Sequence, residues 1–232
     1  MDLLGTLRTL QDEFGETIPR VDPAAPVAAC APWRARDLVV HLARVHHWAA
    51  GRARRRRETP LGRGPFDLVE LYTACAAELR ATFDELGPDA TSATLVGPGP
   101  VTFWHRRQVH ETLVHLWDLR ACGGWDADAA SEVWADGVDE VVTMFEPRQV
   151  RLGRIAPLTR GVALVAEDAA RSWLLGAHQP VAPVVEADVT VTGSAKALGL
   201  VLWHRAAPDE AGVVVSGDRT ALADVLARRI TP

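Results

Sequence analysis

The sequence has no long apolar run. Nowhere in its 232 residues do about 18 apolar residues follow one another, which excludes an ordinary membrane-spanning helix. The amino terminus, MDLLGTLRTLQDEF, also lacks the apolar core of a secretory signal peptide. We therefore expect a cytoplasmic protein with no membrane partner.

Cysteine is scarce, and basic charge is not in excess. Cys30, Cys75 and Cys122 are far apart and form no CxxC pair, so neither a disulfide framework nor a thiolate zinc site is predicted, and we expect buried small residues there. Lys196 is the single lysine, so nearly all the basic residues are arginine. A net charge of -5 and a pI of about 5.9 give no reason to expect nucleic acid as a partner.

The sequence does have the composition of a globular protein, with 48% hydrophobic and 24% charged residues. Its length allows one large domain or two small ones. From residue 1 to about 147, apolar residues recur at helical spacing in five segments separated by short polar links. These segments lie around residues 3–14, 38–49, 66–86, 101–122 and 128–146. The pattern predicts an antiparallel helical bundle over residues 1–150.

The pattern changes near Gly153. Four short runs are rich in β-forming residues and are bounded by turn residues: GVALVAED, SWLLG, ADVTVTG and AGVVVSGD. Two helical stretches, at Ala195–Arg205 and Thr220–Arg229, are interleaved with them. Residues 151–232 are therefore predicted to form a small α/β domain, and the whole chain belongs to the α+β class.

One tract is strongly biased, RARRRR at residues 52–57. Such a run is typical of a solvated, frayed helix end, and binding of an anionic ligand is the alternative.

The stretch HETLVHLWD at residues 110–118 is similar to the zinc-protease motif H-E-x-x-H but has one residue too many. His110 and His115 are five positions apart, or about 140° around a regular helix, and cannot both face one ion. Glu111 and His115 are four positions apart and share a face. The sequence thus excludes the protease motif and leaves Glu111 and His115 as a pair.

This segment has two different faces as a helix. Val109, Leu113 and Leu116 form an apolar stripe, while the face centred on Glu111 also carries Trp104, Arg107, Gln108, Val114, His115 and Asp118. The simplest interpretation of that second face is contact with solvent. The alternative is a ligand site.

A third metal ligand is available in the segment DLVVHL. His41 is flanked there by Leu38, Leu42 and Val45, which predicts that it points into the bundle. A lone buried histidine is usually a hydrogen-bonded core residue. If its helix lies beside the later one, however, His41, Glu111 and His115 can converge on one ion. Two imidazoles and a carboxylate suit zinc, and three protein ligands leave a position for water or substrate.

These residues resemble a known family. WRARDLVVHL at 33–42, followed by RRQVHETLVHLWD at 106–118, is similar to the mycothiol-dependent maleylpyruvate isomerase family, which belongs to the DinB/YfiT-like metal-binding bundles. ADVTVTGSAKALGLVLWHR and VVVSGD resemble that family's small C-terminal domain, which is similar to sterol carrier proteins. The resemblance covers nearly the whole chain and implies a metal triad of His41, Glu111 and His115.

The resemblance also implies an activity. A zinc ion, or another divalent metal, would activate mycothiol for addition to a small electrophilic substrate. The reaction would be either cis-trans isomerisation of a maleylpyruvate-like molecule or transfer of the thiol to the electrophile. The alternatives are a metal-dependent hydrolase on the same bundle and a non-catalytic, metal-binding regulatory protein. The partners expected are the thiol and the substrate, and the chain is expected to be a monomer or a homodimer.

Further residues are candidates for the site. Arg205 is the first candidate to bind carboxylate substrate or thiol, and Arg107 is the second, because guanidinium groups suit carboxylates. The alternative for each is a surface arginine. Asp118, one turn after His115, can orient that imidazole or form an ion pair with Arg107. The remaining histidines of these segments are expected at the surface or outside the metal ligands: His46, His47 and His110.

Overall fold

The computed structural model describes residues 1–176 and 187–232, and its contacts divide the chain into two compact units, Met1–Asp128 and Ala129–Pro232. The first unit is helical, and the second combines helices with a β-sheet. The predicted α+β class is therefore confirmed. None of the described helices is both long and apolar enough to cross a membrane.

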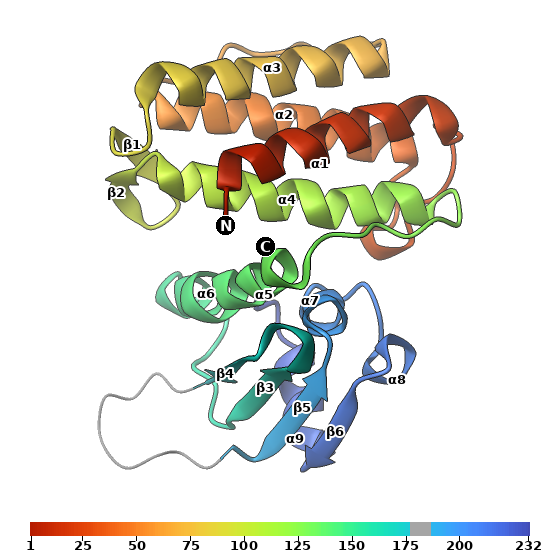
Figure 1. Ribbon diagram of the computed structural model, residues 1–232, viewed down its shortest axis with the longest axis vertical. Coiled ribbons are helices and arrows are strands. Elements are labelled where there is room, and N and C mark those ends of the chain that lie inside the picture. Colours follow the sequence, from red (N-terminus) through yellow and green to blue (C-terminus); the bar gives the residue numbers. More distant parts are fainter. Residues whose placement is uncertain (177–186) are drawn as a thin grey trace. The chain divides into compact units, whose positions relative to one another are not determined.

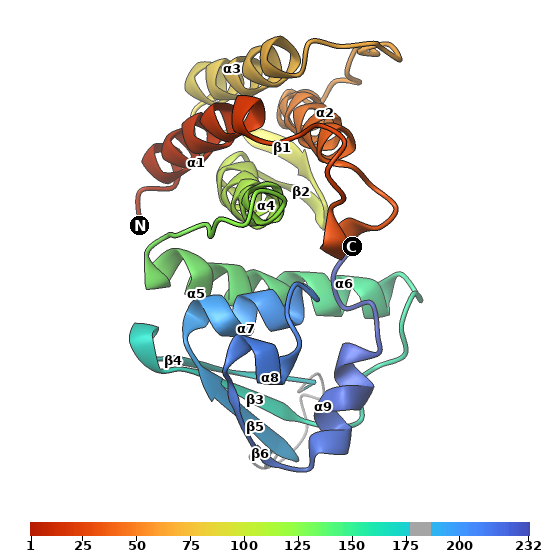
Figure 2. The ribbon, with the colours of Figure 1, turned by 90° about the vertical axis from the view of Figure 1, so that its right-hand side faces the viewer.

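Four long helices of the first unit lie alongside one another (Figure 1). Two short 3-10 turns, η1 (Ile18–Arg20) and η2 (Ala28–Cys30), follow the first of them. The long helices are α1 (Leu3–Thr17), α2 (Ala35–Ala53), α3 (Leu68–Leu86) and α4 (Thr102–Ala121). In Figures 1 and 2, α2 lies beside α3, and α1 lies over α4.

Local signals in the sequence explain where these helices begin and end. The carboxylate of Asp2 accepts a hydrogen bond from the Gly5 amide at the start of α1, and Asp67 caps α3 in the same way through the Glu70 amide. The α3 helix ends at Gly87, whose φ of 73° is accessible to glycine without strain.

Both faces of α4 are covered, because α1 and α2 each pack against it. Its apolar stripe is buried as expected, for example at Leu113 and Leu116. On the opposite face, Gln108 is 1% exposed and Asp118 is 2% exposed. The interpretation of this face as a solvated one is therefore wrong, and its polar groups lie inside the bundle.

The segment between α3 and α4 contains a hairpin that the sequence pattern does not predict. Strands β1 (Thr91–Thr94) and β2 (Gly97–Pro100) pair antiparallel, with Thr91 opposite Pro100. The Thr94 hydroxyl donates to the Gly97 carbonyl oxygen at 2.6 Å. The GPGP motif forms the second strand and gives little β-sheet signal, because proline and glycine are rare in strands.

The arginine tract at 52–57 divides into two parts. Arg54 pairs with Glu85 on α3 at 2.7 Å, and Arg52 donates to the Thr94 carbonyl oxygen at 3.4 Å. Arg55, Arg56 and Arg57 follow the end of α2 and are exposed. The second part agrees with a solvated helix end.

In the second unit, the described residues form a four-stranded sheet with the order β4-β3-β5-β6. Strand β5 runs parallel to β3, and the two outer strands are antiparallel to their neighbours. Alternate residues of β3 are buried, namely Val162, Leu164 and Ala166. The strands are β3 (Val162–Ala166), β4 (Arg171–Leu175), β5 (Val189–Gly193) and β6 (Val214–Gly217).

The second unit also contains helices between and after the strands of this sheet. The two predicted stretches form α7 (Ala195–Leu202) and α9 (Arg219–Leu226). Two shorter elements are also described in this unit: η4 (Glu167–Ala169) and α8 (Pro208–Ala211). All four β-rich runs and both helical stretches of this region are found in the structure.

The helix expected to be the fifth of the bundle lies in the second unit instead. It consists of α5 (Ser131–Glu140), a π-helical turn η3 (Val141–Phe145) and α6 (Glu146–Arg151). Gly199 of α7 allows close approach to α5, since a Cβ there would lie 3.1 Å from the Trp134 ring. The units therefore divide after Asp128, earlier than the boundary expected at 150. The helical stretch continues through Pro147, which follows the π-helical turn η3.

Candidate metal centre

Helices α2 and α4 bring His41, Glu111 and His115 together. The Nε2 atom of His41 lies 3.6 Å from Glu111 Oε1, and the Nε2 atom of His115 lies 3.3 Å from the same oxygen. One potential ligand atom of each residue lies within 4.8 Å of the other two. The sequence thus anticipated the neighbours correctly; that they bind a metal stays a prediction.

The spacing of these atoms fits a divalent ion. Zinc binds nitrogen and oxygen ligands at about 2.1 Å, which places the ligand atoms of a tetrahedral site about 3.4 Å apart. The distances of 3.3 and 3.6 Å lie on either side of this value. Two imidazoles and one carboxylate are also ligands that zinc accepts. The donor set and its spacing are therefore suited to the ion.

The outer atoms of two of these residues are held by neighbours. Arg107 Nη2 donates to Glu111 Oε2 at 2.7 Å, and His115 Nδ1 lies 3.0 Å from Asp118 Oδ2, to which it donates. Each residue is thereby oriented with its other atom, Glu111 Oε1 or His115 Nε2, towards the shared centre. This is how a surrounding shell fixes the orientation of metal ligands.

These contacts refine the roles predicted for Arg107 and Asp118. Arg107 was a candidate substrate-binding residue, but its side chain is only 4% exposed and forms an ion pair with Glu111. Its position is that of a residue that compensates the charge of Glu111. The Asp118 side chain is fully buried beside the His115 imidazole, which agrees with the orienting role.

The charges within the cluster shift its pKa values. Burial raises the pKa of Glu111, but Arg107, His115 and His41 outweigh burial and hold it well below the usual range. Burial lowers the pKa of His115, but its hydrogen bonds with Asp118 and Glu111 raise it to about 9. Because a metal ligand must be deprotonated, binding of an ion at His115 would release a proton.

Replacing Asp118 tests the orienting contact. Asp118→Asn keeps the shape of the side chain but removes the carboxylate that accepts the His115 proton. We expect metal affinity to fall roughly 10- to 100-fold, with an unchanged far-ultraviolet circular dichroism spectrum. Competition with a chromophoric chelator measures the affinity. An affinity equal to that of the wild type would contradict the orienting role.

A second group of potential ligands shares His115. Cys30, His115 and Asp118 also place one atom each within 4.8 Å of the others, and Cys30 Sγ donates to Asp118 Oδ2 at 3.8 Å. The spacing of the cysteines did not predict this second group of ligands. Cys30 lies in η2, far in the sequence from the α4 residues that it contacts. Asp118 is fully buried, whereas the His41 side chain is 34% exposed. The group that contains His41 is therefore the more accessible to an entering ion.

The other histidines of these segments are buried, so of the two positions expected for them the surface one is wrong, and a position outside the metal ligands stays a prediction. His110 is 1% exposed, and it lies outside both groups of potential ligands. His47 is 8% exposed and pairs with Glu78 at 2.5 Å and with the Thr59 carbonyl oxygen at 2.7 Å. Such tertiary partners cannot be read from the periodicity of a single helix.

His46 is fully buried at the centre of the bundle. Its Nδ1 donates to Gln108 Oε1 at 2.7 Å, while its Nε2 has no hydrogen-bond partner among the described residues. Burial lowers the pKa of His46 to about 4, although the bond with Gln108 opposes this. A second proton would have to enter a site that offers it no acceptor.

The lowered pKa of His46 predicts acid sensitivity. The unfolded chain takes up this proton below about pH 6.5 and the folded chain only below about pH 4, so stability is full above pH 6.5 and is lost between these values. At pH 5 the free energy of unfolding should be about 2 kcal/mol lower than at pH 8 through this group alone. His46→Asn should lack that part of the pH dependence. Urea unfolding of both proteins, with a chelator present, measures the difference; equal pH dependence would contradict the prediction.

Arg205, the first candidate for substrate binding, belongs to the second unit. Its Nη1 donates to the Trp203 carbonyl oxygen at 2.7 Å, and its guanidinium carbon lies 5.8 Å from the centre of the Trp203 ring. Its role in binding thiol or substrate stays a prediction.

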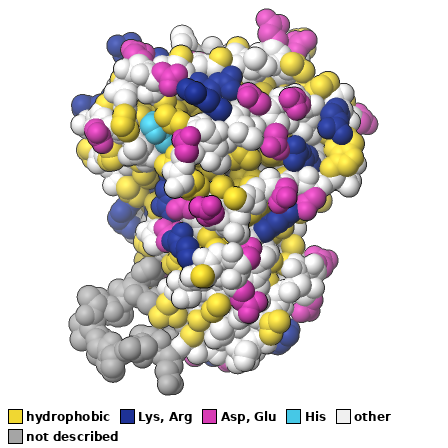
Figure 3. All heavy atoms as spheres, viewed as in Figure 1, with side chains coloured by type: hydrophobic (Ala, Val, Ile, Leu, Met, Phe, Trp, Pro, Cys, Tyr) yellow, Lys and Arg dark blue, Asp and Glu magenta, His cyan; other side chains and the backbone are white. Residues whose placement is uncertain are grey.

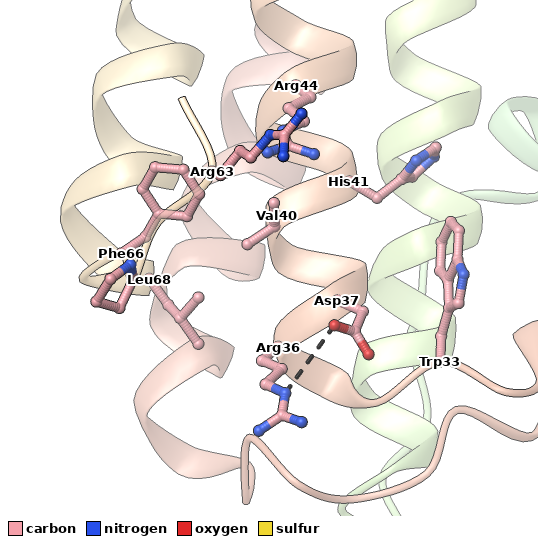
Figure 4. Close-up of a pocket in the computed structure, with 10 residues that line it drawn as sticks. Trp33, Arg36, Asp37, Val40, His41, Arg44, Arg63, Phe66 and Leu68 are labelled. Carbon is pink, nitrogen blue, oxygen red and sulfur yellow. Dashed lines mark ion pairs between the residues drawn. The ribbon is translucent and has the colours of Figure 1, made fainter. Parts of the chain in front are cut away.

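A pocket of about 600 Å³ adjoins the candidate metal centre (Figure 4). We call it the α2 pocket; it is formed by residues 36–44 of α2, Trp33 and the segment 63–68. His41 is one of its lining residues, and the Trp33 ring centre lies 4.8 Å from the His41 ring centre. The pocket thus gives a small molecule access to one residue of the triad.

Known families and structures match the chain over most of its length. The profile described as the mycothiol maleylpyruvate isomerase N-terminal domain matches residues 4–120. The C-terminal domain profile of the same family matches residues 132–224. No curated protein matches the sequence.

Two solved structures have a similar fold. A crystal structure of the mycothiol-dependent maleylpyruvate isomerase aligns with a TM-score of 0.64 at 17% identity, covering 93% of this chain and 92% of that chain. A histidine-to-alanine mutant of the mycothiol-dependent maleylpyruvate isomerase aligns with a TM-score of 0.59 at 18% identity and the same coverage. At this identity the structures show a shared fold, and the two profiles establish the relationship: the chain belongs to the mycothiol maleylpyruvate isomerase family.

Proposed function

We propose that this protein is a zinc-dependent enzyme that uses mycothiol as a cosubstrate and adds it to a small electrophile. The observation that carries the proposal is the convergence of His41 Nε2, Glu111 Oε1 and His115 Nε2 beside the α2 pocket. Family membership supports the choice of thiol and of a maleylpyruvate-like substrate. Another divalent metal can take the place of zinc with the same ligands.

The proposed chemistry requires an available thiolate near neutral pH. A divalent ion held by the triad supplies a positive charge that lowers the pKa of a nearby thiol. The chain contributes the fixed orientation of its ligands: Asp118 holds the Nδ1 proton of His115, and Arg107 compensates the second oxygen of Glu111. Three protein ligands leave room for a further one, which suits a reaction better than a purely structural site.

Two reactions follow from such a thiolate. In an isomerisation, sulfur adds to one carbon of a cis double bond, and the displaced electron pair moves onto the conjugated carbonyl group. Rotation about the new single bond and loss of the same sulfur then give the trans isomer and regenerate the thiolate. In a transfer, sulfur displaces a leaving group and remains bound as a thioether.

An assay with two electrophiles tests the proposal. The zinc-loaded protein is incubated with maleylpyruvate or with monobromobimane, with and without mycothiol. We expect conversion of at least one of them only when mycothiol is present. Conversion that does not need the thiol would favour a hydrolase, and no conversion above the rate without protein would favour a non-catalytic, metal-binding role. Either result would contradict the proposal.

A further inference from the structure

The α2 pocket has an excess of positive charge. Three arginines line it, Arg36, Arg44 and Arg63, against one carboxylate, that of Asp37. Arg36 Nε lies 4.0 Å from Asp37 Oδ1, so this pair partly cancels. Figure 4 shows Arg36 and Asp37 on the same part of α2. The positive charge that remains comes from Arg44 and Arg63.

Arg44 and Arg63 lie close together, and neither forms an ion pair with a carboxylate of the described residues. Arg44 Nη2 donates to the carbonyl oxygen of Gly62, the residue before Arg63, at 2.9 Å. In Figure 4 the two guanidinium groups occupy the same side of the pocket. Glu58 lines an adjoining pocket with both arginines, but within the described part of the chain it forms no ion pair with either. Two neighbouring cations that form no ion pair within the described residues favour an anion between them.

The rest of the pocket is largely apolar. The rings of Trp33 and Phe66 lie on opposite sides of α2 in Figure 4, and the Val40 side chain lies between them. The charges of the pocket differ from those on the face shown in Figure 3, where acidic side chains lie next to basic ones over much of the surface. A pocket that combines aromatic rings with unpaired guanidinium groups suits a ligand that has both a flat apolar part and a negative charge.

We propose that the α2 pocket binds a carboxylate with a flat apolar body, such as an aryl or alkenyl carboxylate. Arg63 and Arg44 hold its carboxylate, and Phe66 and Val40 contact its apolar part. His41 lies at the opposite side of the pocket, so a ligand bound there extends towards the triad. That this ligand is the reacting electrophile rests on the proposed function; the affinity of the pocket for such anions does not.

Matched ligands and variants test the pocket directly. Binding of cinnamate, the neutral cinnamamide and inorganic phosphate to the full-length protein is measured by isothermal titration calorimetry at low ionic strength. The variants are Arg63→Gln and Arg57→Gln. Arg57 is the control, because it is exposed, belongs to the same part of the chain and does not line the pocket. Arg63 forms no ion pair within the described residues, so its replacement should leave the fold intact.

We expect cinnamate to bind roughly tenfold more tightly than either cinnamamide or phosphate. Arg63→Gln should weaken cinnamate roughly fivefold and leave cinnamamide and the metal content unchanged. Arg57→Gln should change none of these. Equal binding of cinnamate and cinnamamide, or equal effects of the two variants, would overturn the carboxylate site. Phosphate binding as tight as that of cinnamate would overturn the apolar part of the site.

The two proposals can fail separately. If the protein turns over no electrophile with mycothiol, but cinnamate binding still depends on Arg63, the pocket assignment holds and the proposed function fails. If thiol-dependent turnover occurs and Arg63→Gln alters neither cinnamate binding nor the KM of a carboxylate substrate, the proposed function holds and the pocket assignment fails.

Discussion

His41→Ala and His115→Ala should each leave the purified protein with little bound metal, whereas the wild type should contain about one zinc ion per chain. Each change removes one of three converging ligand atoms. Since loss of a residue outside the ligands already costs 10- to 100-fold in affinity, loss of a ligand should cost more than about 100-fold. Mass spectrometry of the metal content after dialysis measures the result, and thiol-dependent turnover should fall with it.

His110→Ala is the matched control for this experiment. It removes an imidazole from the position next to Glu111, but His110 belongs to neither group of potential ligands among the described residues. We expect it to retain its metal. Full metal content in both ligand variants would end the triad hypothesis. Loss of metal in His110→Ala alone would show that the centre uses a different histidine.

Arg107→Met should destabilise the protein by about 3 kcal/mol, because it removes the arginine that pairs with the largely buried Glu111 carboxylate and leaves His115 as its charged neighbour. The Arg107 side chain is 4% exposed, and that of Glu111 is 18% exposed. Methionine keeps most of the volume of the arginine stem, so the loss of packing is small. Urea unfolding in the presence of a chelator measures the cost without a contribution from metal.

The double variant Arg107→Met with Glu111→Gln separates charge from packing. Removing the carboxylate as well should restore a large part of the lost stability, because the group that lost its arginine partner is then neutral. If the double variant is as unstable as the sum of the two single ones, the cost comes from packing and not from the ion pair.

The sequence predicted the triad because helical geometry is a local property. The spacing of four residues between Glu111 and His115 places them on one face whatever surrounds the helix. The leucines beside His41 predicted that it points into the bundle; in the structure it lies near Glu111 and His115 of α4, but its side chain is 34% exposed. The distances between the potential ligand atoms come from the structure, because they depend on how α2 and α4 pack together.

Other features could not be predicted, because they depend on neighbours from elsewhere in the chain. The polar face of α4 is typical of a solvated helix, and it is buried because two helices cover it. The approach of Cys30 to Asp118 depends on the path of a loop. Helix α5 belongs to the second unit because it packs closely against α7 at Gly199. Glycine has no side chain, so the sequence pattern does not mark this position as a packing contact.

Two of the three converging residues come from α4, and the third comes from α2. An ion bound by all three would therefore be a removable cross-link, and the segment it encloses contains α3 and the β1–β2 hairpin. Closing that loop reduces the number of conformations open to the chain between the two attachment points. Loss of the ion would remove this link, while side-chain packing and the His46–Gln108 hydrogen bond would still join α2 to α4. The loosening would therefore be local, at the part of α2 that carries His41 and borders the α2 pocket.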